Sequence, residues 1–157
     1  MERSEYELNR VSRVCASELA LYQVTVPEIT TIPKLTLEQA REILQSKYNW
    51  QSQSKDLDPE GERLIAQFAL KEYGSALIYI TNYPFAVRPF YAMKDSSGIG
   101  TESFDLLYNG LEITTGGQRI HKYEELVASI ESRGMKAEDF SDYLLAFKHG
   151  MPPHGGL

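Results

Sequence analysis

The chain has 157 residues, with 16 Lys and Arg against 22 Asp and Glu, so its formal net charge is −6. The length suits one compact domain. A hydrophobic fraction of 42% with 24% charged residues is typical of a globular protein and argues against intrinsic disorder. The acidic balance argues against a stand-alone nucleic-acid-binding module, which is normally basic, although a piece of a larger RNA-binding protein is compatible with it.

The sequence contains one cysteine, Cys15, which cannot form an internal disulfide. No charged-then-apolar leader opens the sequence, and no apolar run approaches the roughly 18 residues of a membrane helix. We therefore expect a cytoplasmic protein without membrane contact. No neighbour in sequence would activate the Cys15 thiol, so we expect a small buried or half-buried residue.

The first 35 residues predict a helix and a connector. Residues 2–22 contain no Gly or Pro, and their apolar residues recur at helical spacing, which predicts an amphipathic helix. The predicted apolar stripe is Leu8, Val11, Cys15, Leu19 and Tyr22. Residues 23–35 are rich in β-branched residues and broken by two prolines, which predicts an extended connector.

Two further helices begin at clear capping signals. Thr36 with Gln39 three positions later forms a capping-box pattern, which predicts a helix over residues 37–47. Asp58 followed by a proline predicts the start of a second helix, over residues 59–73, with a glycine directly after its end.

The middle of the chain predicts strands and the end predicts helices. The predicted strands cover residues 76–81, 87–93, 104–108 and 111–115. Asn109-Gly110 is the strongest short hairpin signal in the sequence and joins the last two strands. The predicted final helices cover residues 122–133 and 137–148, followed by a terminal loop. This order predicts an α+β fold with a mostly antiparallel sheet flanked by helices.

The predicted hairpin contains the highest concentration of candidate ligand-binding side chains in the sequence. A two-residue turn would set the following register: Tyr108 with Leu111, Leu107 with Glu112, and Asp105 with Thr114. Asp105 and Glu112 would then share a face, on a diagonal about 7–8 Å apart at Cα. Two carboxylates there could hold Mg²⁺, which commonly bridges to phosphates, so a nucleotide substrate would be a natural companion. The alternative is two exposed carboxylates on a solvent-facing surface.

Two residues after the hairpin extend this hypothesis. Thr115 has the opposite strand parity to Glu112 and could reach the same ion only if the strand bends, which Gly116-Gly117 would allow. Arg119 could grip a small anion by two parallel hydrogen bonds to a carboxylate. The alternative for Arg119 is an ordinary surface ion pair.

The sequence gives little indication of a histidine-based metal site or of a serine nucleophile. The three histidines are His121, His149 and His154. They form no recognised metal-binding spacing, and no G-x-S-x-G elbow indicates a serine nucleophile. An aromatic cluster is typical of a core or a pocket wall, and consists of Tyr79, Tyr83, Phe90 and Tyr91.

Longer stretches of the sequence resemble one family. They are FDLLYNGLEITTGGQRIH at 104–121, EGERL at 60–64, YP at 83–84, RPFY at 88–91 and KHGMPPHGG at 148–156. Together they cover most of the chain from about residue 30 onward. They resemble aspartyl-tRNA synthetases of the archaeal and eukaryotic type, which belong to class II. The QRIH stretch resembles the aspartyl enzymes more than the asparaginyl ones.

The resemblance implies a class II catalytic fold and a defined set of site residues. It implies activation of aspartate by ATP and transfer to tRNA, by an enzyme expected to be a homodimer when complete. Glu112 would bind ATP through Mg²⁺, and Asp105 would support the same metal. Thr115, where the family often has Ser, would contact Mg²⁺ and the aspartate. Arg119 would hold the aspartate side-chain carboxylate.

The sequence also departs from the family. Motifs 1 and 2 of class II enzymes are not found, and the sequence stops where the Gly-rich, Arg-containing motif 3 would follow. Residues 1–157 therefore predict a partial class II catalytic domain, the segment between motifs 2 and 3, with little or no activity by itself. Two alternatives are a paralogue that acts on a free amino acid without tRNA, and a non-catalytic synthetase-like interaction module.

Overall fold

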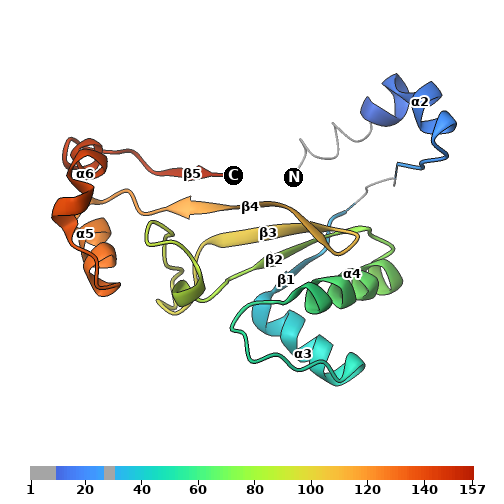
Figure 1. Cartoon of the computed structure of the whole chain (residues 1–157), viewed down its shortest axis with the longest axis horizontal. Coiled ribbons are helices and arrows are strands. Elements are labelled where there is room, and N and C mark those ends of the chain that lie inside the picture. Colours follow the sequence, from blue (N-terminus) through green and yellow to red (C-terminus); the bar gives the residue numbers. More distant parts are fainter. Residues whose placement is uncertain (1–9, 27–30) are drawn as a thin grey trace.

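A computed structural model describes residues 10–26 and 31–157 (Figure 1). Its centre is a five-stranded sheet with the order β1-β2-β3-β4-β5. The strands are β1 (Lys34–Thr36), β2 (Leu77–Thr81), β3 (Ser103–Tyr108), β4 (Leu111–Arg119) and β5 (His154–Gly156). β1 runs parallel to β2 and the other pairs are antiparallel, which confirms the predicted α+β fold with a mostly antiparallel sheet.

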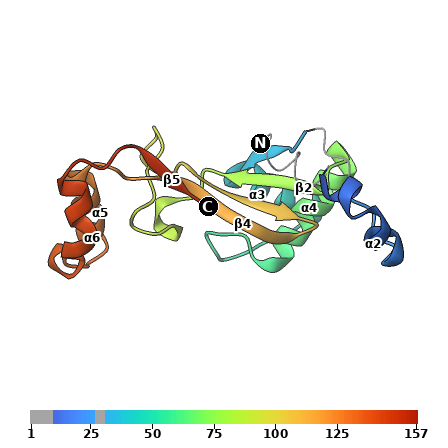
Figure 2. The same cartoon turned by 90° about the horizontal axis from the view of Figure 1, so that it is seen from above.

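Helices flank this sheet in separate groups. They are α2 (Ala16–Leu21), α3 (Leu37–Tyr48), α4 (Pro59–Tyr73), α5 (Tyr123–Ser132) and α6 (Ser141–Lys148), with 3₁₀ turns η1 (Phe85–Val87) and η2 (Ala137–Phe140). α3 and α4 lie together beside the sheet, α5 and α6 lie at one far end of the molecule, and α2 lies at the opposite end (Figures 1 and 2). None of the helices within the described ranges is long and apolar enough to cross a membrane.

The capping signals place α3 and α4 as predicted. The Thr36 hydroxyl accepts from the Gln39 amide at 3.1 Å, and the Gln39 side chain accepts from the Thr36 amide at 2.9 Å. The Asp58 carboxylate accepts from the Gly61 amide at 2.7 Å. These bonds satisfy amide groups that the first turn of a helix leaves unpaired.

The main core fills the space between α3, α4 and the sheet. Its fully buried members include Leu44 and Ile65 from the helices and Ile78, Ile80 and Leu107 from the strands. A second cluster joins α5 and α6 to the segment before β3 through aromatic and aliphatic side chains. Its buried members are Ile120, Leu126, Ile130, Leu144 and Phe147.

The predicted strand at 87–93 is wrong. Val87 is the last residue of the turn η1, and Ala92 pairs only in an isolated bridge with Arg119. Pro89 lies within this segment and lacks the amide hydrogen that a continuous ladder needs, which explains why the β-rich composition does not produce a strand.

Three other element predictions need correction. β1 lies in the predicted connector because it pairs with the distant strand β2, and β5 lies in the predicted terminal loop because it pairs with β4. The helix predicted over 137–148 is divided into η2 and α6. β1 and β5 are each three residues long and form by pairing with distant strands, so neither leaves a periodic signal in the sequence.

The predicted N-terminal helix is only partly described. Residues 10–14 and α2 are helical, whereas residues 2–9 and Pro27 lie outside the described residues. Leu8 of the predicted apolar stripe lies outside the described residues, and the described members are not buried: Val11 is 39% exposed and Tyr22 is 75% exposed. Cys15 is half-buried and free, as expected.

Candidate functional site

A β-bulge in the hairpin decides which side chains share a face. Leu107 pairs with Glu112 as predicted, but Asp105 pairs with Thr115, so the predicted pairing of Asp105 with Thr114 is wrong. The register shifts because Ile113 is an extra residue that no partner on β3 opposes. Asp105, Glu112 and Thr115 consequently share one face, and the irregularity expected at Gly116-Gly117 occurs at Ile113 instead.

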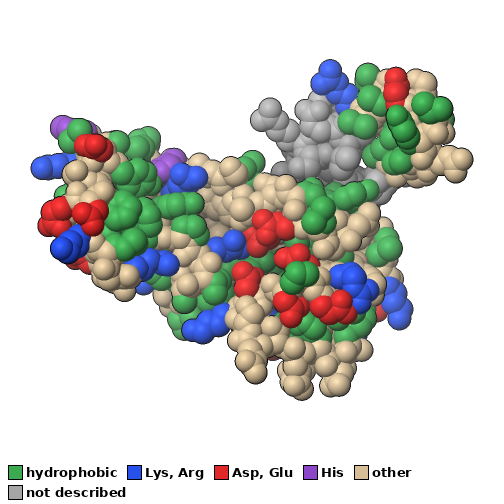
Figure 3. All heavy atoms as spheres, in the orientation of Figure 1, with side chains coloured by type: hydrophobic (Ala, Val, Ile, Leu, Met, Phe, Trp, Pro, Cys, Tyr) green, Lys and Arg blue, Asp and Glu red, His purple; other side chains and the backbone are tan. Residues whose placement is uncertain are grey.

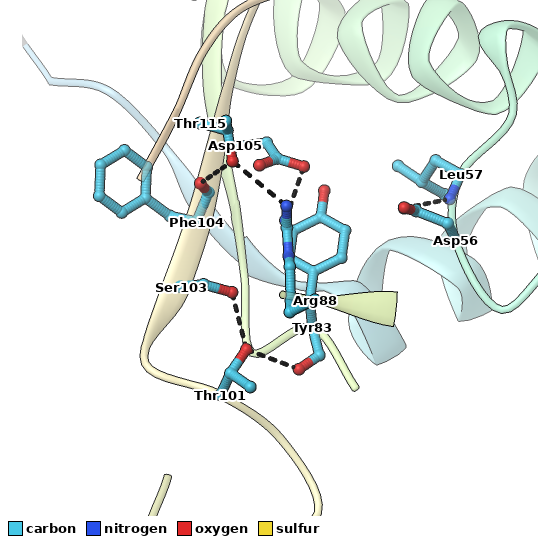
Figure 4. Close-up of polar contacts among 9 residues, drawn as sticks. All are labelled: Asp56, Leu57, Tyr83, Arg88, Thr101, Ser103, Phe104, Asp105 and Thr115. Atoms are coloured by element: carbon cyan, nitrogen blue, oxygen red, sulfur yellow. Dashed lines mark hydrogen bonds and ion pairs between the residues drawn. The ribbon is translucent and has the colours of Figure 1, made fainter. Parts of the chain in front are cut away.

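Asp105 is buried against an arginine that the sequence analysis did not select. The Arg88 Nη2 atom lies 2.7 Å from Asp105 Oδ2, and the two side chains are only 12% and 6% exposed. Arg88 Nη1 also donates to Thr115 Oγ1 at 3.2 Å, as Figure 4 shows. One guanidinium therefore links the two facing residues of β3 and β4.

Tyr83 completes the surroundings of this ion pair. The guanidinium carbon of Arg88 lies 3.7 Å from the centre of the Tyr83 ring, a close cation–π contact. Burial, followed by the charge and hydrogen bonding of Asp105, raises the pKa of Tyr83 far above its usual range. The Tyr83 carbonyl accepts from the Thr101 hydroxyl at 2.9 Å. Tyr83 is thus a neutral, fixed wall of the site.

Further carboxylates gather beside Asp105. Figure 3 shows acidic side chains grouped over the region between β4 and α4. Burial, then the charge of Asp105, raises the pKa of Glu112, and Arg88 opposes this effect. Burial, then the charge of Glu112, likewise raises the pKa of Glu62 on α4. Carboxylates that repel one another in this way gain from a nearby cation.

These oxygens fit a magnesium ion that shares its coordination with a ligand. Oδ1 of Asp105 is buried without a hydrogen-bond partner, Glu112 is exposed, and Thr115 adds a hydroxyl. In the part of the chain that the structure describes, no group of three or more His, Cys, Asp or Glu is placed to hold a metal ion. Because Mg²⁺ typically takes one or two carboxylates together with water and phosphate oxygens, this donor set matches its requirements.

A pocket of about 240 Å³ lies next to these donors. Its lining comes from the segment before β3, from the first residue of β3, and from β4 and β5. It includes Arg88, Tyr91, Thr115, Gly116, Gly117 and Arg119. This volume is below the ~300–1,000 Å³ of sites for drug-sized molecules, so it suits a small ligand.

Arg119 gives this pocket a positive charge. It is half-buried, and its guanidinium carbon lies 4.7 Å from the centre of the Tyr91 ring. Within residues 10–26 and 31–157, no carboxylate forms an ion pair with Arg119. The surface ion pair considered as an alternative for Arg119 is therefore absent from these residues, and its planar donor group can receive an anion.

The glycine pair brings backbones together instead of bending the strand. A Cβ atom on Gly117 would lie 2.6 Å from the Glu102 carbonyl oxygen and 2.8 Å from Ser103 Cα. A Cβ atom on Gly116 would lie 2.8 Å from the Gly156 carbonyl oxygen. These distances are shorter than a side chain tolerates, so both positions favour glycine, as expected where strands approach closely.

Sequence reasoning selected four residues of this region and gave Tyr83 only the general role of a core or pocket wall, and it assigned no role to Arg88. Both residues directly precede a proline, in the short motifs YP and RPFY that contributed to the resemblance. Arg88 directly follows the turn η1, whereas the prediction placed it inside a strand. A strand would have pointed alternate side chains to opposite faces and concealed this contact.

Residues 5–157 match the family model of the class II tRNA synthetases (D, K and N). The chain therefore belongs to this family. Its curated relatives include the aspartate–tRNA(Asp/Asn) ligases of Aeropyrum pernix, 51% identical over 88% of this chain, and of Thermus thermophilus, 45% identical over 96%. This chain covers 32% and 35% of those two proteins, so it spans about a third of their length and fits a segment of such an enzyme.

Solved structures agree on the fold. The aspartyl-tRNA synthetase of Entamoeba histolytica matches 94% of this chain with a TM-score of 0.85 and 25% identity, and the match covers 32% of that chain. An asparaginyl-tRNA synthetase of Pyrococcus horikoshii matches 97% of this chain with a TM-score of 0.83 at 23% identity, over 37% of its own length. The second likeness concerns the fold alone.

Proposed function

We propose that residues 1–157 are part of the catalytic domain of an aspartate–tRNA ligase, namely the segment between class II motifs 2 and 3. In the complete enzyme this segment would supply the aspartate pocket and part of the Mg²⁺·ATP site. The observation that carries the proposal is the Arg119 guanidinium, which lines one pocket with Thr115 and has no carboxylate partner among the residues described.

Arg119 is the proposed receptor for the aspartate side chain. A guanidinium can donate two parallel hydrogen bonds to a carboxylate, which an ammonium group cannot reproduce. The Tyr91 ring supports one face of the guanidinium and restricts its orientation. The Thr115 hydroxyl lines the same pocket and would contact the bound aspartate.

Asp105, Glu112 and Thr115 are the proposed protein donors to Mg²⁺, and Glu112 would also meet ATP through it. When bound, this ion would neutralise charge on the phosphates of ATP. The residues themselves contribute a fixed set of oxygens: Asp105 is held by Arg88, and Thr115 lies directly opposite Asp105. The raised pKa of Glu112 would return toward its usual value once a cation lies beside it.

The proposed reaction joins the aspartate α-carboxylate to the α-phosphate of ATP and releases pyrophosphate. The aspartyl group is then transferred to tRNA, and AMP is released. Its phosphate charge needs stabilisation by arginines of motifs 2 and 3, which this sequence does not contain. We therefore expect little or no adenylate formation from the isolated chain. The complete ligase is proposed to act as a homodimer in the cytoplasm.

A chimera tests this function without relying on the isolated segment. This chain would replace the matching third of the Aeropyrum pernix ligase, with which it is 51% identical over 142 residues. We expect aspartate-dependent exchange of pyrophosphate into ATP, and charging of tRNA. Exchange without charging would favour a paralogue that acts on a free amino acid. A folded chimera without exchange would favour a non-catalytic module.

A further inference from the structure

Arg88 contacts two of the three proposed oxygen donors, yet the roles above give it no function. Its Nη2 atom lies 2.7 Å from Asp105 Oδ2, and its Nη1 atom donates to Thr115 Oγ1 at 3.2 Å. Figure 4 shows the guanidinium between these two side chains, with the Tyr83 ring against its face. A single planar group therefore sets the distance and direction between a buried carboxylate and a hydroxyl of the pocket.

The backbone that carries Arg88 is fixed on both sides by α5 and its end. Arg133 Nη2 donates to the Phe85 carbonyl at 2.8 Å, and its guanidinium carbon lies 4.4 Å from the centre of the Phe85 ring. The Ser129 hydroxyl donates to the Phe90 carbonyl at 2.5 Å. These two bonds hold the segment on either side of Arg88, so its guanidinium is directed by packing as well as by charge.

The contacts of Arg88 leave defined lone pairs unused. Its ion pair occupies Asp105 Oδ2 and leaves Oδ1 buried without a hydrogen-bond partner. Thr115 Oγ1 accepts from Arg88 and donates to the Phe104 carbonyl at 3.4 Å. A hydroxyl oxygen has two lone pairs, so Thr115 keeps one for another ligand.

We propose that Arg88 is a positioning residue, which orients Asp105 and Thr115 so that their remaining lone pairs face a divalent cation. This inference rests on the proposed function, because it concerns the donors of the same metal site. Arg88 acts through the two donors and does not touch the ion.

The test replaces Arg88 by lysine in the chimera described above. Lysine keeps a positive charge for Asp105 but cannot also hold Thr115 in the geometry of a planar fork. We expect Mn²⁺ to bind about tenfold more weakly, as for the loss of one charged hydrogen bond. The probe is Mn²⁺ alone, followed by the electron paramagnetic resonance signal of the free ion. Arg63→Lys is the control, since Arg63 makes a similar but exposed pair with Glu60.

A double-mutant cycle separates positioning from general damage. If Arg88 acts through Thr115, Arg88→Lys should weaken Mn²⁺ binding much less in a Thr115→Val background than in the parent, because interacting sites are not additive. Independent, multiplying effects would overturn the proposal, as would unchanged Mn²⁺ affinity in Arg88→Lys.

Two further readouts keep the result interpretable. If Arg88→Lys does not fold, Arg133→Met removes a bond to the Arg88 segment without touching the donors, and a smaller loss of Mn²⁺ affinity is expected; no loss would overturn the proposal. Aspartate-dependent exchange by the parent chimera reports on the proposed function separately. A parent that binds Mn²⁺ through Arg88-dependent donors but shows no exchange would contradict the ligase function and support the role of Arg88.

Discussion

β3 and β4 form one hairpin but have opposite surroundings. Most of β3 is buried, whereas β4 has no fully buried residue. β3 contributes Leu107 to the main core and Asp105 to the ion pair with Arg88. β4 contributes Glu112, Thr115 and Arg119, which are exposed or half-buried. The buried strand therefore fixes the exposed strand, which presents the groups that can meet a ligand.

The bulge at Ile113 brings a ligand-facing residue of the exposed strand β4 opposite the buried Asp105 of β3. The tight turn sets the register near Leu107, and the extra residue then shifts it so that Thr115 lies opposite Asp105. Without the shift, Thr115 would point to the other face of the sheet. The first of the following predictions compares the two strands directly, and the others concern the exposed strand and the helix α4 beside it.

The largest expected difference is between Leu107→Ala and Ile113→Ala. Leu107 is 1% exposed, so its truncation should reduce the free energy of unfolding by about 2–5 kcal/mol. Ile113 is 52% exposed, so its truncation should reduce the free energy of unfolding by less than about 1 kcal/mol. Urea unfolding of the chain followed by circular dichroism measures both values, and equal losses would contradict the division between the strands.

Gly117→Ala should have the next largest effect. The added methyl group would overlap backbone atoms of residues 102 and 103, so the strands must separate, and we expect a loss of about 1–3 kcal/mol. Gln118→Ala, at the next and exposed position, should stay within about 0.5 kcal/mol. The same unfolding experiment applies, and a neutral Gly117→Ala would show that the close approach is unimportant.

Arg119→Lys should affect ligand use instead of folding. The loss of a bidentate grip should raise the aspartate KM of the chimera about tenfold or more, while the KM for ATP changes little. Pyrophosphate exchange at varied aspartate and varied ATP measures the two constants. Arg63→Lys is the control, and an unchanged aspartate KM in Arg119→Lys would exclude Arg119 as the carboxylate receptor.

The smallest expected effect concerns the acidic group between β4 and α4. Because the fold raises the pKa of Glu62 above its ordinary value of 4.5, its contribution to stability is present below pH 4.5 and is lost as pH rises through the raised pKa. Glu62→Gln should therefore slightly raise Tm at pH 7, and the gain should vanish below pH 4.5. Melting curves across pH 4–8 measure this, and a lower Tm at pH 7 would contradict the repulsion.

Local signals were sufficient for the capped helices and the hairpin. The Thr36 and Asp58 caps fix the starts of α3 and α4 through bonds to residues three positions away. Asn109-Gly110 likewise fixes the turn between β3 and β4. In each case the determining contacts lie within a few residues, so the sequence pattern contains them.

The remaining features depend on contacts between distant parts of the chain. β1 and β5 are three residues long and exist because neighbouring strands accept them. The bulge at Ile113 and the pairing of Arg88 with Asp105 also depend on the assembled sheet. The site residues Asp105, Glu112, Thr115 and Arg119 could be proposed from spacing and resemblance, but their arrangement around Arg88 could not.

The most direct test of the central claim is a crystal structure of the chimera with Mg²⁺ and a non-hydrolysable aspartyl-adenylate analogue. We predict the aspartate side-chain carboxylate on the Arg119 guanidinium, and the ion within coordination distance of Asp105, Glu112 and Thr115. An analogue whose side-chain carboxylate lies away from Arg119 would contradict the assignment of this pocket to aspartate.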